Sequence, residues 1–300
     1  MDANFKLDYA EAISEFERVL KKFNLKKKIF KLLFNSRGLE FEQYRDFNEG
    51  EDASMIDWSA SSRANKLLAK QYIEEREINF FFVADMSKSM LFGSANKLKA
   101  EYSTDVILSL SNIITSSGDN TGLVTFNEEV ISYLPPSNLK KQFFAMQESL
   151  SKISSYEKSA EFRNVFEFLF NTIKRRNTMV ILISDFLHNS QELEKNLRLL
   201  SAKCEVIAIA IRDPMDTELP KTTDLLVLSN SQDDSTIVID SSISQLAYKQ
   251  VAREQIERVR TVFKNAAVDL LELRTDQPFV IPIINFLQER SRGGENGIVV

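Results

Sequence analysis

The sequence contains few of the residues that carry covalent or base chemistry. Its 300 residues include one cysteine, Cys204, and one histidine, His188. A single cysteine excludes an internal disulfide and a cysteine-rich zinc site. A serine hydrolase is disfavoured because the lone histidine is accompanied by no Gly-x-Ser-x-Gly elbow. We therefore interpret His188 as a loop residue rather than a catalytic base.

Glycine, proline and long apolar runs are also scarce. With only 8 glycines and 6 prolines, most of the chain should be regular structure. No apolar run approaches the ~20 residues that span a bilayer, and the N-terminus does not resemble a signal peptide. The net charge of −5 argues against general nucleic-acid binding, which usually needs a basic face. With the single cysteine, these features predict a soluble protein of the reducing cytoplasm.

Against this background, one stretch has a clear pattern. Residues 78–84 form a nearly continuous apolar run, which is typical of a strand buried on both faces of a parallel sheet. The run ends in Asp85-Met-Ser-Lys-Ser89, and a second apolar run, Thr178 to Asp185, also ends in an aspartate. Ligands of open α/β sheets bind at the carboxyl ends of the strands. Both aspartates are therefore candidates for a binding site.

Apolar strands alternate with amphipathic helices along most of the chain, which predicts an α/β fold. We expect a doubly wound, mostly parallel sheet flanked by helices and preceded by an N-terminal helical and extended segment. The expected strands are 67–73, 78–85, 121–126, 130–134, 178–185, 204–211, 225–228 and 237–239, and the expected helices are 7–34, 97–116, 139–153, 162–173, 193–200, 244–263 and 279–290. The predicted units are an extension over 1–77, a main domain over 78–290 and a flexible tail over 291–300.

The strand-end residues Asp85, Ser87, Ser89 and Asp185 offer oxygen atoms only. Such a set suits magnesium or calcium better than zinc or copper. No phosphate-binding glycine loop is present, and a phosphoaspartate enzyme would normally carry a second aspartate at position 87. A divalent-metal hydrolase using the two aspartates remains an alternative at this point.

Two segments before the main domain have open interpretations. Lysines between Lys21 and Lys31 alternate with apolar residues, which fits either a solvated helix face or peripheral contact with anionic lipid or an acidic partner. In the polar segment that follows, Tyr44, Phe47 and Trp58 can bury, and arginines lie near carboxylates. This segment could pack on the main sheet as an extension, or its arginines could bind a partner.

Several motifs resemble a known family. Asp85-Met-Ser-Lys-Ser89 resembles the Asp-x-Ser-x-Ser signature of von Willebrand factor A domains, and Ile183-Ser-Asp185 resembles their later strand-end aspartate. The stretch from Gly38 to Arg63, with Tyr-Arg-x-Phe-x-x-Gly-x-Asp and Ile-Asp-Trp, resembles a bacterial subgroup called domain of unknown function 58. Its members commonly accompany MoxR-type AAA+ ATPases. The resemblance implies that the two aspartate-bearing strands are neighbours.

The resemblance implies a metal-ion-dependent adhesion site. Ser87 and Ser89 would ligate Mg²⁺ directly, Asp85 and Asp185 would hold it through water, and a partner's carboxylate would fill an open position. The family also has a threonine that opens the helix preceding the Asp185 strand. That position falls on Ala160, beside Ser159, and alanine cannot ligate a metal. Two outcomes stay open: a weakened site with Ser159 as a candidate ligand, or a metal-free loop anchor.

The function implied is a non-catalytic protein-binding module. Its partner would be a MoxR-type AAA+ ATPase or a client of that ATPase. Candidate partner-binding residues are Arg45, Asp57, Trp58 and Arg63. The alternatives are a scaffold whose degenerate site holds no metal, and the divalent-metal hydrolase.

Overall fold

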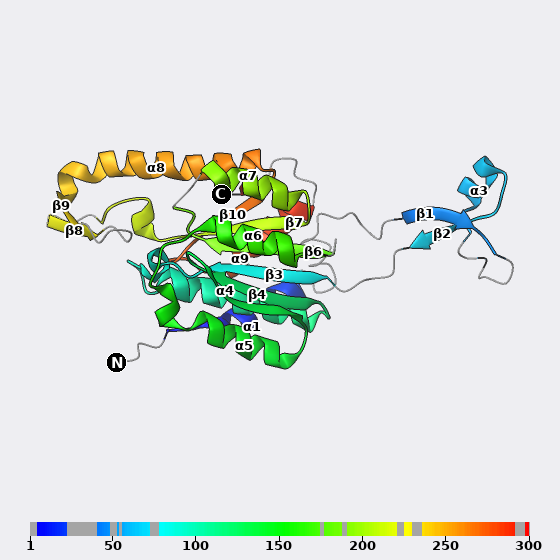
Figure 1. Cartoon of the computed structure of the whole chain (residues 1–300), viewed down its shortest axis with the longest axis horizontal. Helices are drawn as coiled ribbons and strands as arrows, with labels where there is room; N and C mark the ends of the chain where they lie inside the picture. The colour runs from blue at the N-terminus through cyan, green and yellow to red at the C-terminus, as the bar shows by residue number, and fades with distance from the viewer. Residues whose placement is uncertain are drawn as a thin grey trace.

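The computed structural model describes residues 5–22, 41–48, 53, 56–72, 78–174, 177–187, 191–220, 225–229, 236–291 and 298–299. Its centre is a seven-stranded sheet in the order β11-β10-β7-β6-β3-β4-β5 (Figure 1). Its strands are β3 (Asn79–Asp85), β4 (Asn120–Phe126), β5 (Val130–Ser137), β6 (Thr178–Ser184), β7 (Glu205–Arg212), β10 (Asp269–Arg274) and β11 (Ile298–Val299). All neighbours are parallel except β4 and β5. The predicted mostly parallel α/β fold is confirmed.

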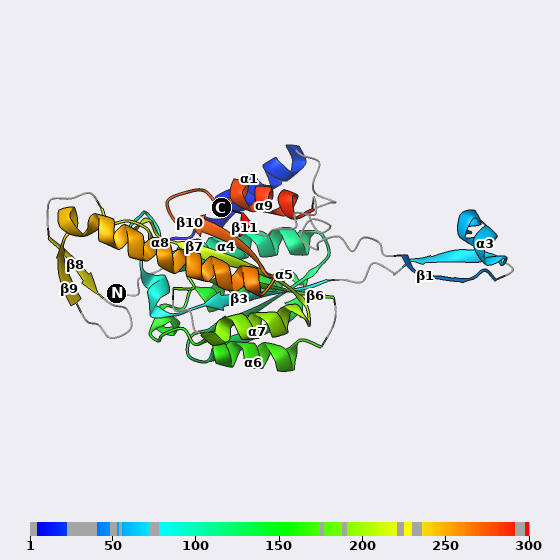
Figure 2. The same cartoon turned by 90° about the horizontal axis from the view of Figure 1, so that it is seen from above.

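Helices cover both faces of the sheet, as Figure 2 shows for α1, α4 and α9 on one side and α6 and α7 on the other. One layer consists of α1 (Tyr9–Lys22), α4 (Lys99–Ser116), α5 (Lys140–Leu150) and α9 (Val280–Ser291), and the other of α6 (Phe162–Thr172), α7 (Gln191–Ser201) and α8 (Ser241–Asn265). Successive side chains of a strand point to opposite faces. Phe80 and Phe82 accordingly join the first apolar core, and Phe81 and Val83 join the second. This explains the continuous apolar run of β3.

The register places the ends of β3 and β6 side by side. Ala84 lies opposite Ile183 in the parallel ladder, so Asp85 and Asp185 leave the sheet at the same edge. The implied neighbourhood of these two strands is therefore confirmed. Three short 3-10 helices surround this edge or lie close to it: η2 (Lys88–Leu91), η3 (Ile153–Tyr156) and η4 (Pro214–Asp216).

Some elements differ from the sequence-based expectations. The helix expected over 7–34 begins at Tyr9 and is described to Lys22, and it packs on α4 as part of the main body. Strand β10 was not expected. Within the tail predicted to be flexible, Ile298–Val299 pairs with β10 as β11. The lysine side chains from Lys21 to Lys31, and His188, lie outside the described part of the chain.

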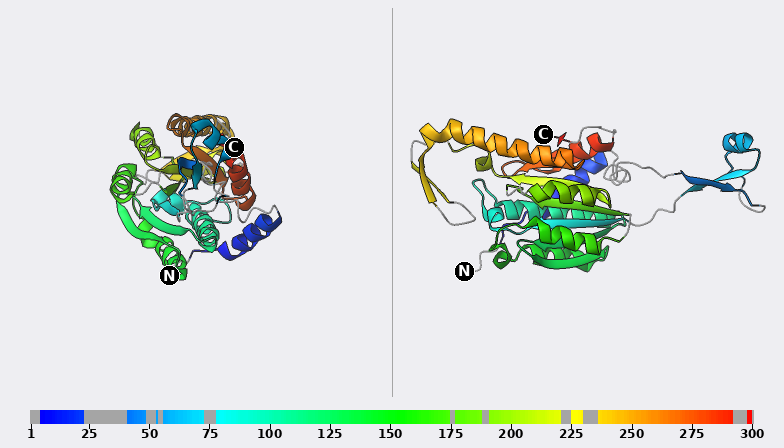
Figure 3. Two further views of the ribbon diagram at one scale, coloured as in Figure 1. Left: turned by 90° about the vertical axis from the view of Figure 1, so that its right-hand side faces the viewer. Right: turned by 45° about the horizontal axis from the view of Figure 1, so that its top comes forward.

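The polar segment forms a small arm of its own. Strands β1 (Phe41–Asp46) and β2 (Leu68–Tyr72) pair antiparallel, and α3 (Trp58–Ala64) lies between them in sequence. Figures 1 and 3 show the arm apart from the seven-stranded sheet. Of the aromatic residues that could bury there, Tyr44 is 38% exposed and Trp58 is 66% exposed. Those two aromatic side chains therefore do not anchor the arm to the main sheet.

A second hairpin, β8 (Leu225–Ser229) and β9 (Thr236–Asp240), lies with the first turns of α8 beyond the carboxyl edge of the sheet (Figure 1). Both of its strands were expected from the sequence. Among the helices that the structure describes, none combines the length and the apolarity needed to cross a bilayer.

Candidate functional site

The candidate site begins with two aspartates at the ends of adjacent strands. Asp85 is the last residue of β3, and Asp185 directly follows β6. The Ser184 hydroxyl donates to Asp85 Oδ2 at 2.5 Å and so connects the two strand ends. Both carboxylates are buried. The structure thus brings together two residues that lie 100 positions apart in the sequence.

The serines of the Asp85 loop turn toward these carboxylates. The Ser87 backbone N–H donates to Asp85 Oδ1 at 2.8 Å, which closes a tight turn after β3. The Ser87 and Ser89 hydroxyls lie 3.1 Å apart, within hydrogen-bond distance, and Ser89 also bonds Asp185. The Lys88 N–H donates to the Lys158 carbonyl at 2.8 Å. The loop that carries Ser159 and Ala160 therefore lies beside the serine loop.

A lysine that the sequence analysis did not single out lies within the site. Lys99 Nζ is 2.7 Å from Asp185 Oδ2 and 3.4 Å from Asp216 Oδ2. The Lys99 side chain is only 1% exposed, and the Phe92 ring centroid lies 5.8 Å from its Nζ. Lys99 is also the first residue of α4, where the helix dipole disfavours a cation. The two carboxylates offset that cost.

The two aspartates have opposite electrostatic environments. Burial, and then the nearby Asp185 charge, raises the pKa of Asp85 to about 6 against the hydrogen bonds from Ser184 and Ser87. Burial also acts to raise the pKa of Asp185, but the Lys99 ammonium outweighs it and holds that pKa at about 2. The pKa of Lys99 is raised because Asp185 and Asp216 outweigh its burial. Asp185 and Lys99 therefore form a buried ion pair at neutral pH.

A second aspartate anchor lies next to this pair, at the end of β7. Asp213 accepts hydrogen bonds from the Ser94 backbone at 2.8 Å, from the Ser94 hydroxyl, and from Thr275 Oγ1 at 3.2 Å. The Arg212 guanidinium donates to the carbonyl of Asp185. The loops after β3, β6, β7 and β10 are therefore connected by side-chain hydrogen bonds along one edge.

The sequence contained a usable signal for part of this network. Asp213 follows the apolar strand β7 after a single arginine, and it thus repeats the pattern of Asp85 and Asp185. Asp216 caps the same turn, since its carboxylate accepts from the Asp213 N–H at 2.8 Å. Lys99 had no such signal. Nothing in Lys97-Leu-Lys99 indicates which lysine points toward the strand ends.

The predicted partner-binding residues lie on the arm. Asp57 caps α3 and accepts a 3.0 Å hydrogen bond from the Tyr44 hydroxyl, and Arg63 Nε donates to the Ser59 carbonyl at 3.3 Å. Arg45 lies on β1, but its side chain is outside the described part of the chain. The arm precedes the amino end of β3, whereas the carboxylate cluster lies at its carboxyl end. The structure does not bring these two predicted sets together.

The cluster shares only one property with a magnesium site. Its oxygen donors are of the right chemical kind. The Lys99 ammonium nevertheless already binds Asp185 Oδ2, and Ala160 contributes no side-chain oxygen. Asp85, Ser87, Ser89 and Asp185 are each no more than 7% exposed, so they do not present an open coordination position to solvent. The charge and the enclosure of the cluster do not fit the implied magnesium site.

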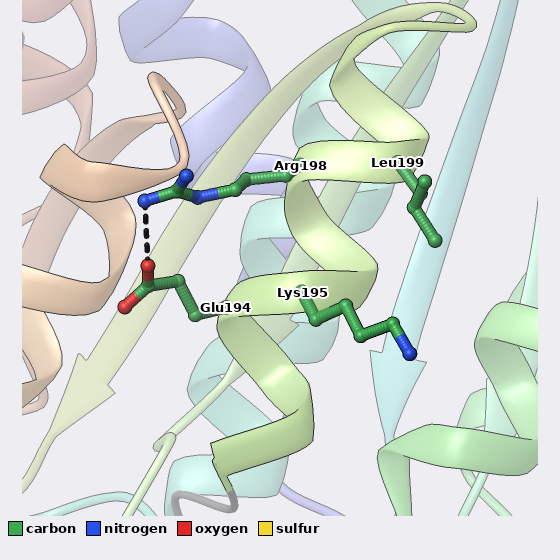
Figure 4. A pocket seen from close by; sticks show the side chains of 4 residues that line it. All are labelled: Glu194, Lys195, Arg198 and Leu199. Carbon is green, nitrogen blue, oxygen red and sulfur yellow. Dashed lines mark hydrogen bonds and ion pairs between the residues drawn. The ribbon is translucent and has the colours of Figure 1, made fainter.

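One surface hollow lies elsewhere, on α7. It is lined by Glu194, Lys195, Arg198 and Leu199 (Figure 4). Arg198 pairs with Glu194 of the preceding turn at 2.7 Å. A hollow lined by a single helix face, with an ion pair satisfied within it, offers no convergent polar groups for a ligand. The carboxylate cluster remains the candidate site.

Comparisons with known proteins point to one family. A family model described as "Protein of unknown function DUF58" matches residues 43–259. An uncharacterized protein of Mycobacterium tuberculosis is 27% identical over 267 residues, which cover 87% of this chain and 82% of that protein. An uncharacterized protein of Mycobacterium avium is 32% identical over 126 residues, which cover 41% of this chain and 73% of that protein.

Solved structures with a similar fold have low sequence identity. The conserved hypothetical protein BatB of Bacteroides thetaiotaomicron is 13% identical, with coverage of 72% of this chain and 98% of that chain and a TM-score of 0.46. The von Willebrand factor type A protein from Catenulispora acidiphila is 10% identical, with coverage of 72% and 42% and a TM-score of 0.38. Since both TM-scores are below 0.5, the fold assignment depends on the strand order itself.

Proposed function

We propose, starting from the fact that this chain belongs to the DUF58 family, that it is a non-catalytic protein-binding module. The partner docks at the carboxyl edge of the sheet, around the loops that carry Asp85 and Asp185. One observation carries the proposal. Each carboxylate of this edge is already held by a donor of the same chain, so the cluster fixes the loops around it as one rigid surface.

Exposed apolar side chains next to the edge support a docking role. Tyr248 of α8 donates to the Met215 carbonyl at 2.7 Å, which fixes the start of α8 against the loop that holds Asp216. On the same part of α8, Leu246 is 83% exposed and Val251 is 59% exposed. The buried cores of protein interfaces are more apolar than the rest of the surface, whereas single exposed apolar residues are common on any surface. Their position beside the cluster makes them the first contacts to test.

The proposed partner is a MoxR-type AAA+ ATPase or a client protein of such an ATPase. This part of the proposal derives from the family resemblance of the motifs at Tyr44 to Asp52 and at Asp85 to Ser89. The same resemblance implies magnesium bridging to a partner carboxylate, which the charge and the enclosure of the cluster disfavour. A chelator tests it directly.

The arm supports a second candidate surface. Trp58, Leu67 and Tyr44 are all exposed large apolar residues on one small element. Aromatic residues are enriched among binding hot spots. In this alternative the protein is a scaffold that holds its partner through the arm, and the carboxylate cluster only stabilises the fold.

Binding assays with surface variants separate the two surfaces. The probe is a purified MoxR-type ATPase from the same organism, and wild type is compared with Leu246→Glu/Val251→Glu, Trp58→Ala and the control Phe144→Ala on exposed α5. Each is measured with Mg²⁺ and with EDTA. Docking at the edge predicts binding about tenfold or more weaker only for the α8 double variant, a loss of about 1.4 kcal/mol or more.

The other outcomes are equally informative. Weaker ATPase binding by Trp58→Ala alone would place the interface on the arm. A loss of ATPase binding in EDTA, reproduced by Asp85→Ala in the presence of Mg²⁺, would support the magnesium bridge. If wild type does not bind the ATPase, capture from the native cell with wild type and the same three variants identifies the partner class. Turnover of a phosphoester by wild type, lost in Asp185→Ala, would instead support the hydrolase.

A further inference from the structure

We infer that the Lys99 ammonium is the resident cation of the carboxylate cluster, so that this edge of the sheet is held together without a divalent metal. The inference concerns the cluster alone. It requires no partner, and it stands or falls independently of the proposed binding function.

The position of Lys99 carries the inference. Its Nζ lies 2.7 Å from Asp185 Oδ2 and 3.4 Å from Asp216 Oδ2, and its side chain is 1% exposed. Charged lysine side chains are almost never fully buried unless they are paired. Here one ammonium bridges the loops after β6 and β7, which is the connection that a shared metal ion would otherwise make.

A metal ion beside this ammonium would be repelled. Mg²⁺ binds oxygen at about 2.0–2.1 Å, so an ion bound directly to Asp185 Oδ2 would lie within about 5 Å of Lys99 Nζ, and an ion held through water would lie within about 8 Å of it. Like charges at that distance in a buried site disfavour each other strongly. A divalent ion and the charged lysine therefore compete for the same carboxylate.

The side-chain oxygens of Asp85, Ser87 and Ser89 form hydrogen bonds within the chain. Asp85 accepts from the Ser87 N–H at 2.8 Å and from the Ser184 hydroxyl at 2.5 Å. The Ser87 and Ser89 hydroxyls lie 3.1 Å apart and pair with each other. Ala160, where the family has a threonine, supplies no oxygen. Hydrogen bonds within the chain therefore stabilise the buried oxygen atoms that a metal ion would otherwise coordinate.

The loop before α4 covers the lysine. The Lys99 N–H donates to the Phe92 carbonyl at 2.9 Å, and the Phe92 ring centroid lies 5.8 Å from the ammonium. Ser94 of the same loop donates to Asp213. Water and hydrated ions are kept from Lys99 Nζ by this cover.

The first test is a divalent titration of the full-length wild type. Melting temperatures are measured in EDTA and with millimolar Mg²⁺ or Mn²⁺, because a ligand that binds the folded state raises the melting temperature. We expect no shift beyond the measurement error. A rise in melting temperature that Asp85→Ala abolishes would overturn the inference.

The second test is a double-mutant cycle between Lys99 and Asp185. Lys99→Met keeps the length of the side chain and removes its charge, and it leaves a buried unpaired carboxylate. We expect a large drop in melting temperature, and adding Asp185→Asn should recover much of it. If the drop in melting temperature of the double variant equalled the sum of the two single drops, the two charges would not be coupled and the inference would be overturned.

The matched control is Lys97→Met. Lys97 also pairs with buried Asp105, and lies 2.8 Å from Asp8, but these carboxylates are outside the strand-end cluster. Its drop in melting temperature should not be recovered by Asp185→Asn. If Asp185→Asn also raised the melting temperature of Lys97→Met, its effect would be nonspecific, and the assignment to Lys99 would be overturned. Should Lys99→Met fail to fold alone, the Lys99→Met/Asp185→Asn protein and the wild-type titration decide the question.

Discussion

At the scale of single residues, Asp85 and Asp185 look equivalent in the sequence but differ in the structure. Each is an aspartate that follows an apolar strand. Burial and the neighbouring charge raise the pKa of Asp85 to about 6, whereas Lys99 holds that of Asp185 at about 2. The sequence predicted the presence of both residues at one edge. It could not predict the difference, because Lys99 reaches Asp185 across 86 positions of the chain.

The raised pKa of Asp85 predicts a pH dependence of stability. An unfolded aspartate has a pKa of about 3.9, so between about pH 4 and pH 6 the folded state binds more protons. The free energy of unfolding should therefore fall as the pH rises through this window, by about 2 to 3 kcal/mol from Asp85 alone. Urea unfolding from pH 4 to pH 7 measures it, and Asp85→Asn should remove that decrease.

Asp276→Asn provides the control for this experiment. The hydrogen bond from Arg274 lowers the pKa of Asp276, so its contribution is lost at acid pH rather than between pH 4 and pH 6. This variant should keep the wild-type slope. An unchanged slope in Asp85→Asn would contradict the assigned environment of Asp85.

At the scale of elements, the clearest predictions came from strands buried on both faces. β3, β6 and β7 are continuous apolar runs, because helices cover both sides of each. β10 was missed because Asp-Leu-Leu-Glu-Leu-Arg mixes charged and apolar residues, and Glu272 pairs with Arg260 of α8. This segment forms a strand because it pairs with β7, which is distant in sequence. Such tertiary pairing leaves little local signal.

Helix α1 shows a related limit. Its helical spacing was visible, but the periodicity of a helix does not indicate which surface it covers. The structure places Phe16 in the main core, with its ring centroid 6.1 Å from that of Phe279. The first helix of the predicted extension therefore packs into the core of the main body.

Truncation of Phe16 tests this placement. Phe16→Ala should lower the free energy of unfolding by about 3 to 5 kcal/mol, because a fully buried aromatic side chain is removed from a packed core. Ser14→Ala, on the exposed side of α1, should change it by less than about 0.5 kcal/mol. Urea unfolding measures both. A cost below about 1 kcal/mol for Phe16→Ala would mean that α1 is not part of the cooperative fold.

At the scale of the whole molecule, two candidate surfaces lie at opposite ends of β3. The carboxylate cluster follows its carboxyl end, and the arm precedes its amino end. Motifs resembling the same family occur at both places, so the sequence alone could not say whether they form one site. The exposed state of the arm aromatics was also not predictable, since their apolar character suggested burial.

Trp58 gives a direct probe of the arm, because it is the only tryptophan of the chain. With 66% of its surface exposed, its fluorescence should have a water-like emission maximum and be strongly quenched by iodide. Protection from iodide on adding the ATPase would place the interface on the arm. Unchanged quenching in a formed complex would place the interface elsewhere. Leu246→Glu/Val251→Glu serves as the control, since it should leave the quenching of the free protein unaltered.

The outer strand β5 has a consequence for how the protein behaves at high concentration. Pro135 and Pro136 carry no N–H, and because successive N–H groups of a strand point to opposite sides, one of them removes a donor from this outer edge. Gly122 of β4 lets β5 approach closely, since a Cβ there would lie 2.9 Å from the Leu134 carbonyl oxygen. Strands with unpaired donors recruit further strands and seed aggregates. A proline pair at the rim blocks that growth. Concentrated solutions should therefore resist fibril formation that starts from this side of the sheet.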